Sequence, residues 1–186
     1  MSQRALFTAD LEAEAAPSDS WCTAPEVMEI VHRFWPEGIS LDACSNRSAI
    51  ALGFVRAKTA WTIRENCLTQ PTWNVAKPRT TCWLQPPYGR DGAPIVLDWA
   101  RRWDAGELWE TLALVRLDTS TEHWRALDAR ATSLVLFRER LAHYQDGVRA
   151  STSNFCSAML MTTRADPKVR HRALEAAVGD LGHVYY

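Results

Sequence analysis

The sequence lacks the patterns that mark metal sites, secreted proteins and membrane proteins. Its five cysteines form no CxxC pair and its five histidines form no HxxxH pair, so it has none of the ligand spacings typical of zinc sites. Its apolar runs are far shorter than the roughly 18 residues of a membrane span, and acids occupy the N-terminal stretch where a signal peptide has its apolar core. We therefore predict a soluble, cytoplasmic protein with reduced thiols, no metal site and no membrane partner.

Lysine is also scarce, and the overall charge is close to neutral. The 21 basic residues include only three lysines, Lys58, Lys77 and Lys168, and the rest are arginines. Arginine suits bidentate contacts with phosphates and base edges, although a genome rich in arginine codons explains the bias equally well. A net charge of −1 argues against a protein that simply coats nucleic acid.

The chain has the size and composition of one folded domain. With 186 residues, 47% of them apolar, it can bury a substantial core and is too hydrophobic to be disordered. Residues 1–19 mix alanine, acids, serine and proline without an amphipathic period, and we predict that they form a mobile acidic tail. Residues 20–186 are predicted to form a single domain.

From residue 23 onward, the apolar pattern predicts alternating helices and strands. Thr23-Ala24-Pro25-Glu26 has the composition of a capping box with an early proline, and predicts a helix that begins there and ends near Trp35. Further helices are predicted at 46–56, 94–104, 121–131 and 167–178, and strands at 39–43, 58–63, 80–84, 111–117, 134–138, 155–162 and 181–185.

This alternation predicts an α/β fold with a mostly parallel sheet and helices on both faces. Because ligands in such folds bind beyond the carboxyl ends of the strands, the residues after Ala43, Leu84 and Leu117 are candidates for a site. Of the nine tryptophans, four lie on apolar faces and are predicted to be core: Trp35, Trp83, Trp99 and Trp103. Four others flank the candidate site, where each either packs or stacks on a flat ring: Trp21, Trp61, Trp73 and Trp124.

The strand predicted at 80–84 leads directly into Gln85-Pro86-Pro87-Tyr88-Gly89. Neither proline has an N–H, so the sheet ladder cannot continue, and the carbonyls of Gln85 and Pro86 are left without ladder partners. An aromatic ring follows at once, and then a glycine that lets the chain turn. Rigid acceptors beside an aromatic ring suit the capture of a flat ring that bears an amine.

This motif resembles the Asp/Asn/Ser-Pro-Pro-Tyr/Phe motif of amino-methyltransferases that use S-adenosylmethionine. From about Ser20 to the C-terminus, the chain is similar to the phage-type (Dam-like) DNA N6-adenine methyltransferases. Five further segments carry this resemblance in the family's order: Trp21-Cys-Thr-Ala-Pro25, Leu41-Asp-Ala-Cys-Ser45, Glu65-Asn-Cys-Leu68, Leu117-Asp-Thr-Ser-Thr-Glu-His-Trp124 and Phe137-Arg-Glu-Arg-Leu141.

The resemblance implies a Rossmann-like methyltransferase fold that binds S-adenosyl-L-methionine across neighbouring strand ends. It assigns Asp42 to the methionine part of the cofactor, and Glu65 or Asn66 to the adenosine part. Trp21 and Thr23 wall the cofactor on the N-terminal side. Ser45 lies in the turn where many methyltransferases have glycine. The chain contains no GxGxxG loop.

The resemblance also implies that the substrate is adenine flipped out of duplex DNA. Gln85 and the Pro86 carbonyl would hold the two hydrogens of the N6 amine, Pro87 would stiffen the loop, and Tyr88 would stack on the base. Four residues are assigned to DNA contacts: Asp118, Trp124, Arg138 and Arg140, although the two arginines also suit a solvated strand edge. Loops around 71–79 and 145–154 are predicted to read a very short target sequence.

One residue of the motif departs from the family, which has Asp, Asn or Ser where this chain has Gln85. Glutamine keeps a carboxamide acceptor but is one methylene longer, which leaves open a retuned enzyme, a slow enzyme or a scaffold without transfer. Asn66 in place of an acid and Arg116 near a usual proline are smaller departures. The expected function is therefore DNA adenine N6-methylation, in the host cell cytoplasm if the gene is phage-encoded. The alternatives are a module that binds DNA, protein or cofactor without turnover, and an amino-methyltransferase with another acceptor such as cytosine N4.

Overall fold

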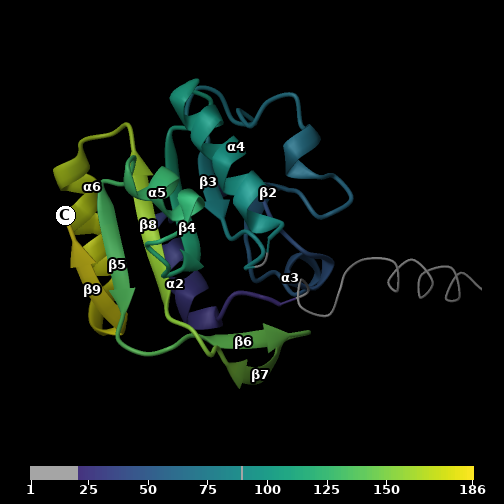
Figure 1. Cartoon of the computed structure of the whole chain (residues 1–186), viewed down its shortest axis with the longest axis vertical. Coiled ribbons are helices and arrows are strands. Elements are labelled where there is room, and N and C mark those ends of the chain that lie inside the picture. The colour runs from purple at the N-terminus through teal and green to yellow at the C-terminus, as the bar shows by residue number, and fades with distance from the viewer. Residues whose placement is uncertain (1–20, 89) are drawn as a thin grey trace, which may run out of the picture.

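A seven-stranded sheet forms the centre of the fold, seen in the computed structural model of the chain (Figure 1). The structure describes residues 21–88 and 90–186, so the predicted tail at 1–19 and the turn residue Gly89 lie outside the described residues. Across the sheet the strands are β2 (Ala57–Ala60), β1 (Ile39–Asp42), β3 (Thr81–Leu84), β4 (Glu110–Arg116), β8 (Ser157–Thr163), β5 (Ser133–Phe137) and β9 (Gly182–Tyr185).

The sheet is mixed but mostly parallel, which confirms the predicted α/β class. Strands β2, β1, β3 and β4 pair in parallel, and β5 runs in the same direction. Strands β8 and β9 are antiparallel to their neighbours. The reversal at β8 has a simple cause: no crossover helix lies between β5 and β8 in this described part of the chain, and a parallel pairing needs such a connection.

Helices cover both faces of the sheet, as the sequence predicts. Helices α2 (Pro25–Phe34) and α6 (Pro167–Val178) pack together on one face, and α4 (Gly92–Asp104) and α5 (Glu122–Asp128) on the other. Strand β4 joins the two cores, because Leu112 and Leu114 face the first helix pair whereas Ala113 and Val115 face the second. Within the described residues, no helix has the length and apolarity to cross a membrane.

Two helix predictions are wrong in detail. The N-cap of α2 is Ala24, which has no polar side chain, so no side chain caps the helix; the Thr23 hydroxyl lies outside the helix and donates to Gln85. The helix predicted at 46–56 is only α3 (Arg47–Ala51). Gly53 follows it in the left-handed region, with φ of 65°, and ends the helix there.

A two-stranded hairpin, β6 (Ala142–Gln145) and β7 (Val148–Thr152), replaces most of the loop predicted at 145–154. Asp146 and Gly147 form its turn with φ of 50° and 80°, as a type I′ turn requires. Cys22 forms an isolated antiparallel bridge with Tyr144. The hairpin lies below the sheet in Figure 1, beside the start of the described chain.

Candidate functional site

A cavity of about 730 Å³ opens at the carboxyl ends of β1 and β3. The chain leaves β1 for β2 on one side and later returns to β3 on the other side, so the cavity lies where the strand order reverses, the usual ligand position in open α/β sheets. The two strand ends are joined where the Ala43 N–H donates to the Trp83 carbonyl at 3.1 Å. The cavity has the volume of a typical small-molecule site.

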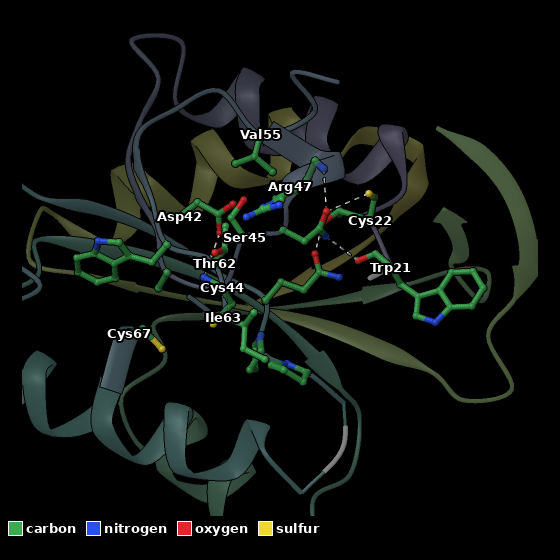
Figure 2. A pocket seen from close by; sticks show the side chains of 18 of the residues that line it. Trp21, Cys22, Asp42, Cys44, Ser45, Arg47, Val55, Thr62, Ile63 and Cys67 are labelled. Carbon is green, nitrogen blue, oxygen red and sulfur yellow. Dashed lines mark hydrogen bonds between the residues drawn. The ribbon is translucent and has the colours of Figure 1, made fainter. Parts of the chain in front are cut away.

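Most residues assigned from the sequence line this one cavity. All four residues of the diproline motif and five of the six cofactor residues do so: Gln85, Pro86, Pro87, Tyr88, Trp21, Thr23, Asp42, Ser45 and Asn66. Figure 2 shows Trp21 at the opposite end of the lining from Asp42. Glu65 is not among the lining residues; its carboxylate accepts from the Thr62 N–H at 2.8 Å and from the Thr62 hydroxyl at 2.6 Å.

Asp42 is a buried carboxylate at the end of β1, with only 2% of its surface exposed. Burial raises its pKa to about 6, and the hydrogen bond from the Cys44 N–H, at 3.3 Å, only partly opposes this rise. The ionised carboxylate is therefore costly in the folded protein. A cationic group of a ligand in the cavity would lower that cost.

The two prolines form a rigid corner between β3 and α4. Pro86 is buried directly after the strand end, and α4 begins at Gly92 against the same corner. A Cβ built on Gly92 would lie 2.0 Å from the Pro87 carbonyl oxygen. Only glycine therefore allows the first turn of α4 to approach the corner this closely.

Tyr88 belongs to a group of partly buried aromatic rings. Its ring centroid lies 5.0 Å from that of Phe155 and 6.2 Å from that of His143, and His143 lies 5.6 Å from Trp21. Burial raises the Tyr88 pKa to about 12, and interactions of its hydroxyl with Ser157 and Gln85 only partly oppose this rise. Burial also lowers the pKa of His143, which favours the neutral ring. We call Trp21, Tyr88, His143 and Phe155 the aromatic cluster.

The sequence analysis missed His143 and Phe155. The signal for them was the Asp146-Gly147 dipeptide, which predicts a tight hairpin and so brings β6 back beside the cavity. Gln145 and Asp146 themselves line it. Phe155 lies just before β8, in the segment that returns from the hairpin to the sheet.

Polar contacts tie the segment before α2 to the cavity. The Asn46 side chain caps α3 by accepting from the Ala49 N–H at 2.8 Å and donates to the Trp21 carbonyl at 3.4 Å. The Cys22 N–H donates to the Tyr144 carbonyl at 2.7 Å. The Thr23 hydroxyl donates to the side-chain oxygen of Gln85. Three distant parts of the chain therefore meet at residues 21–23.

Two thiols, Cys44 and Cys67, face each other in the cavity wall (Figure 2). A hydrogen bond between them is the main reason that the pKa of Cys44 is raised and that of Cys67 is lowered. All five cysteines are free thiols. Residues 21–88 and 90–186 contain no group of three or more His, Cys, Asp or Glu side chains arranged to hold a metal ion.

The residues assigned to DNA contacts are divided between core and surface. Trp124 is 4% exposed and packs in the core beside α4, so its ring faces are covered and cannot stack on a base. Trp73 is likewise fully buried. Asp118 accepts hydrogen bonds from the N–H and hydroxyl of Ser120 at 3.2 and 2.6 Å. Arg138 and Arg140 are exposed between β5 and the hairpin.

The cavity combines three kinds of recognition: a buried carboxylate for a cation, two rings of the aromatic cluster, Trp21 and Tyr88, for a flat ring, and acceptor groups on a rigid corner. No protein-family model and no curated protein matches the chain. The chemistry of the cavity is therefore the basis for assigning a function.

Proposed function

We propose that the protein is an S-adenosylmethionine-dependent methyltransferase that acts on the N6 amine of adenine in DNA. One observation supports this most strongly: Gln85-Pro86-Pro87-Tyr88 and Asp42 line the same cavity, at the reversal point of the sheet. Transfer requires a donor site and an acceptor site that open toward each other. The proposal includes a Rossmann-like methyltransferase fold, and the strand order of the sheet is compatible with it.

The lining suits the proposed cofactor. The amino and sulfonium groups are cations that the buried Asp42 carboxylate would attract. Trp61, Ile63 and Leu68 also line the cavity and offer apolar side chains to the adenine ring of the cofactor. When bound, the cofactor supplies an electrophilic methyl group on a sulfonium and leaves as a neutral thioether.

Gln85 and Pro86 would hold and orient the acceptor amine. The N6 lone pair is delocalised into the purine ring, which makes the nitrogen a poor nucleophile. Acceptance of its two hydrogens by the Gln85 side-chain oxygen and the Pro86 carbonyl would draw it toward tetrahedral geometry and aim the lone pair at the methyl carbon. One N–C bond forms as the S–C bond breaks, and the amine releases one proton to water.

The aromatic cluster would receive the flipped base. Unstacking a base from a duplex costs a few kcal/mol, and stacking on aromatic rings returns about 1–3 kcal/mol per base. Tyr88 directly follows the acceptor groups, so a base stacked on it would place its exocyclic amine beside Pro86. The neutral ring of His143 adds a second aromatic surface without repelling the cofactor's cation.

Exposed arginines lie on segments that neighbour this cluster in the chain. Arg138 and Arg140 lie at the entrance to the hairpin, and Arg149 lies on β7, whose residues are all exposed. The Arg116 guanidinium lies 5.5 Å from the ring centroid of Phe155. Arginines in these positions would bind phosphates on both sides of a flipped nucleotide.

The test is incubation of the purified protein with duplex DNA and cofactor that carries a labelled methyl group, followed by digestion to nucleosides. We expect label in N6-methyladenosine. Tyr88→Ala should abolish most transfer, whereas Tyr185→Ala should not, because Tyr185 is 51% exposed on the outer strand β9.

Two other results would each replace the proposed function. Label on cytosine would indicate an amino-methyltransferase with N4 as its acceptor. Cofactor binding without label in any nucleoside would indicate a binding module that has lost transfer. Calorimetry with the cofactor alone separates this second result from a protein that does not bind the cofactor at all.

A further inference from the structure

The side chain of Gln85 is held by a residue near the start of the described chain. Gln85 comes directly after β3, whereas Thr23 lies just before α2, and the Thr23 hydroxyl donates to the Gln85 side-chain oxygen across 62 positions of sequence. Thr23 is buried, at 6% exposure.

Thr23 is itself fixed on both sides. On one side, the N–H of Cys22 is bonded to the hairpin through the Tyr144 carbonyl, at 2.7 Å. On the other side, the carbonyl of Ala24 accepts from the Val27 N–H at 3.0 Å, in the first turn of α2. The hydroxyl of Thr23 is therefore free of any capping duty and held at one position in the cavity wall.

A carboxamide needs such a contact in a way that a carboxylate or a hydroxyl does not. The two ends of the Gln85 amide have nearly the same shape, but the oxygen accepts hydrogen bonds whereas the NH₂ donates them. If the amide turned end for end, its NH₂ would face the amine hydrogens of the substrate. Two donors would then oppose each other, and the amine could not be held.

We propose that Thr23 is a positioning residue that keeps the Gln85 oxygen directed toward the substrate amine. This role rests on the proposed function. An amide oxygen has two lone pairs: the Thr23 hydroxyl takes one, and the other accepts a hydrogen of the amine. The extra methylene of Gln85 allows its oxygen to reach Thr23, so the longer side chain and the threonine act as a pair.

The test is a double-mutant cycle that combines Thr23→Val with Gln85→Glu. Valine has nearly the same shape as threonine but no hydroxyl. With Gln85 present, we expect Thr23→Val to lower kcat about tenfold, with little change in cofactor affinity, and Thr23→Ser to restore most of it. With Gln85→Glu present, we expect Thr23→Val to change kcat less than twofold, because the two oxygens of a carboxylate are equivalent.

A second measurement, by ¹⁵N NMR, does not depend on activity. The NH₂ resonances of Gln85 are identified by their absence in Gln85→Glu. We expect one sharp pair in the wild type and in Thr23→Ser, and a broadened or doubled pair in Thr23→Val. This spectrum decides the matter if Gln85→Glu is inactive.

The outcomes separate the two proposals. A wild type that transfers no methyl group to DNA overturns the proposed function, and the role of Thr23 with it. Equal losses of kcat in the Gln85 and Gln85→Glu backgrounds, an unchanged Gln85 resonance pair in Thr23→Val, or weaker cofactor binding as the main effect of Thr23→Val overturns the positioning role and leaves the proposed function standing.

Discussion

Replacement of Asp42 by asparagine should stabilise the protein while it weakens cofactor binding. Asp42 is 2% exposed, and burial raises its pKa from 3.8 to about 6. The difference corresponds to about 3 kcal/mol, by which ionisation of this carboxyl group disfavours the folded state at neutral pH. The introduced amide keeps part of the desolvation cost, so we expect Asp42→Asn to gain about 1–3 kcal/mol.

The gain should depend on pH in a defined direction. Between pH 4 and 6 the unfolded chain loses the Asp42 proton while the folded protein keeps it, so the stability of the wild type falls relative to Asp42→Asn as the pH rises. Below about pH 4 the carboxyl group is protonated in both states, and the difference should largely disappear. Above about pH 6 it should be complete and constant. The nearby thiols of Cys44 and Cys82 do not ionise in this range, since their pKa values are raised well above 9.0.

The assay is thermal unfolding of both proteins at intervals between pH 4 and pH 8, without cofactor. For a chain of this length, 1 kcal/mol shifts the Tm by about 2–4 °C, so Asp42→Asn should unfold about 2–12 °C higher at pH 7.5. Asp128→Asn is the matched control, because Asp128 is exposed at the end of α5, and its Tm should follow that of the wild type.

The same variant tests the site. If the carboxylate attracts a cation, the cofactor affinity of the wild type should fall as the pH drops below about 6, and that of Asp42→Asn should be low at every pH. A buried charge that costs stability and supports binding is typical of a functional residue. The reasoning is refuted if Asp42→Asn is less stable than the wild type at pH 7.5, or if the difference in Tm does not change with pH.

Three further substitutions test other parts of the structure. Gly92→Ala places a Cβ against the Pro87 carbonyl and should lower methyl transfer at least tenfold, because a misplacement of about 1 Å can cost about 100-fold in rate. Arg102→Met removes a buried cation that donates to Glu107 and to the carbonyl of Pro71 at 3.0 Å, and should destabilise the fold by about 3–5 kcal/mol in denaturant unfolding. Arg140→Ala should weaken DNA binding for all sequences and reduce the salt dependence of log K by about 1.

Each of these substitutions has a matched control. Ala93→Ser changes the next position of α4, Arg101→Met removes a side chain that is 69% exposed, and Arg172→Ala removes an exposed arginine of α6. If a control variant behaves like its test variant, the effect comes from general loss of stability or charge. Normal transfer by Gly92→Ala would show that the corner tolerates displacement.

The sequence predicted the sheet, the helices and most of the cavity lining because these depend on local patterns. Residues 80–84 read as a strand followed by two prolines, and that strand end does lead into the cavity. Asp42 was also placed correctly at a strand end, since a short apolar run that stops at an acid is visible without any tertiary information. The predicted elements already have no helix between 134–138 and 155–162, so the antiparallel direction of β8 could have been inferred from that connection.

The positions that sequence reasoning misplaced are those where a distant contact competes with a local one. Thr23 has the residue type and spacing of a helix cap, yet its hydroxyl donates to Gln85. Trp124 falls in a segment that resembles a family motif, yet α5 turns its ring into the core. Glu65 bonds to Thr62 within its own turn. In each case the partner, rather than the residue, decides the role.

The hairpin is the part of the site that local patterns describe least well. All five residues of β7 are exposed, so the alternation of apolar and polar residues along the strand does not mark a buried face. Two hydrogen bonds hold the hairpin in place instead. The Cys22 N–H donates to the Tyr144 carbonyl of β6, and the Ser48 hydroxyl donates to the Asp146 carboxylate at 2.5 Å. These contacts join residues near 22, 48 and 145 around one opening. The cavity wall is therefore completed by contacts between distant parts of the chain, which local sequence patterns do not reveal.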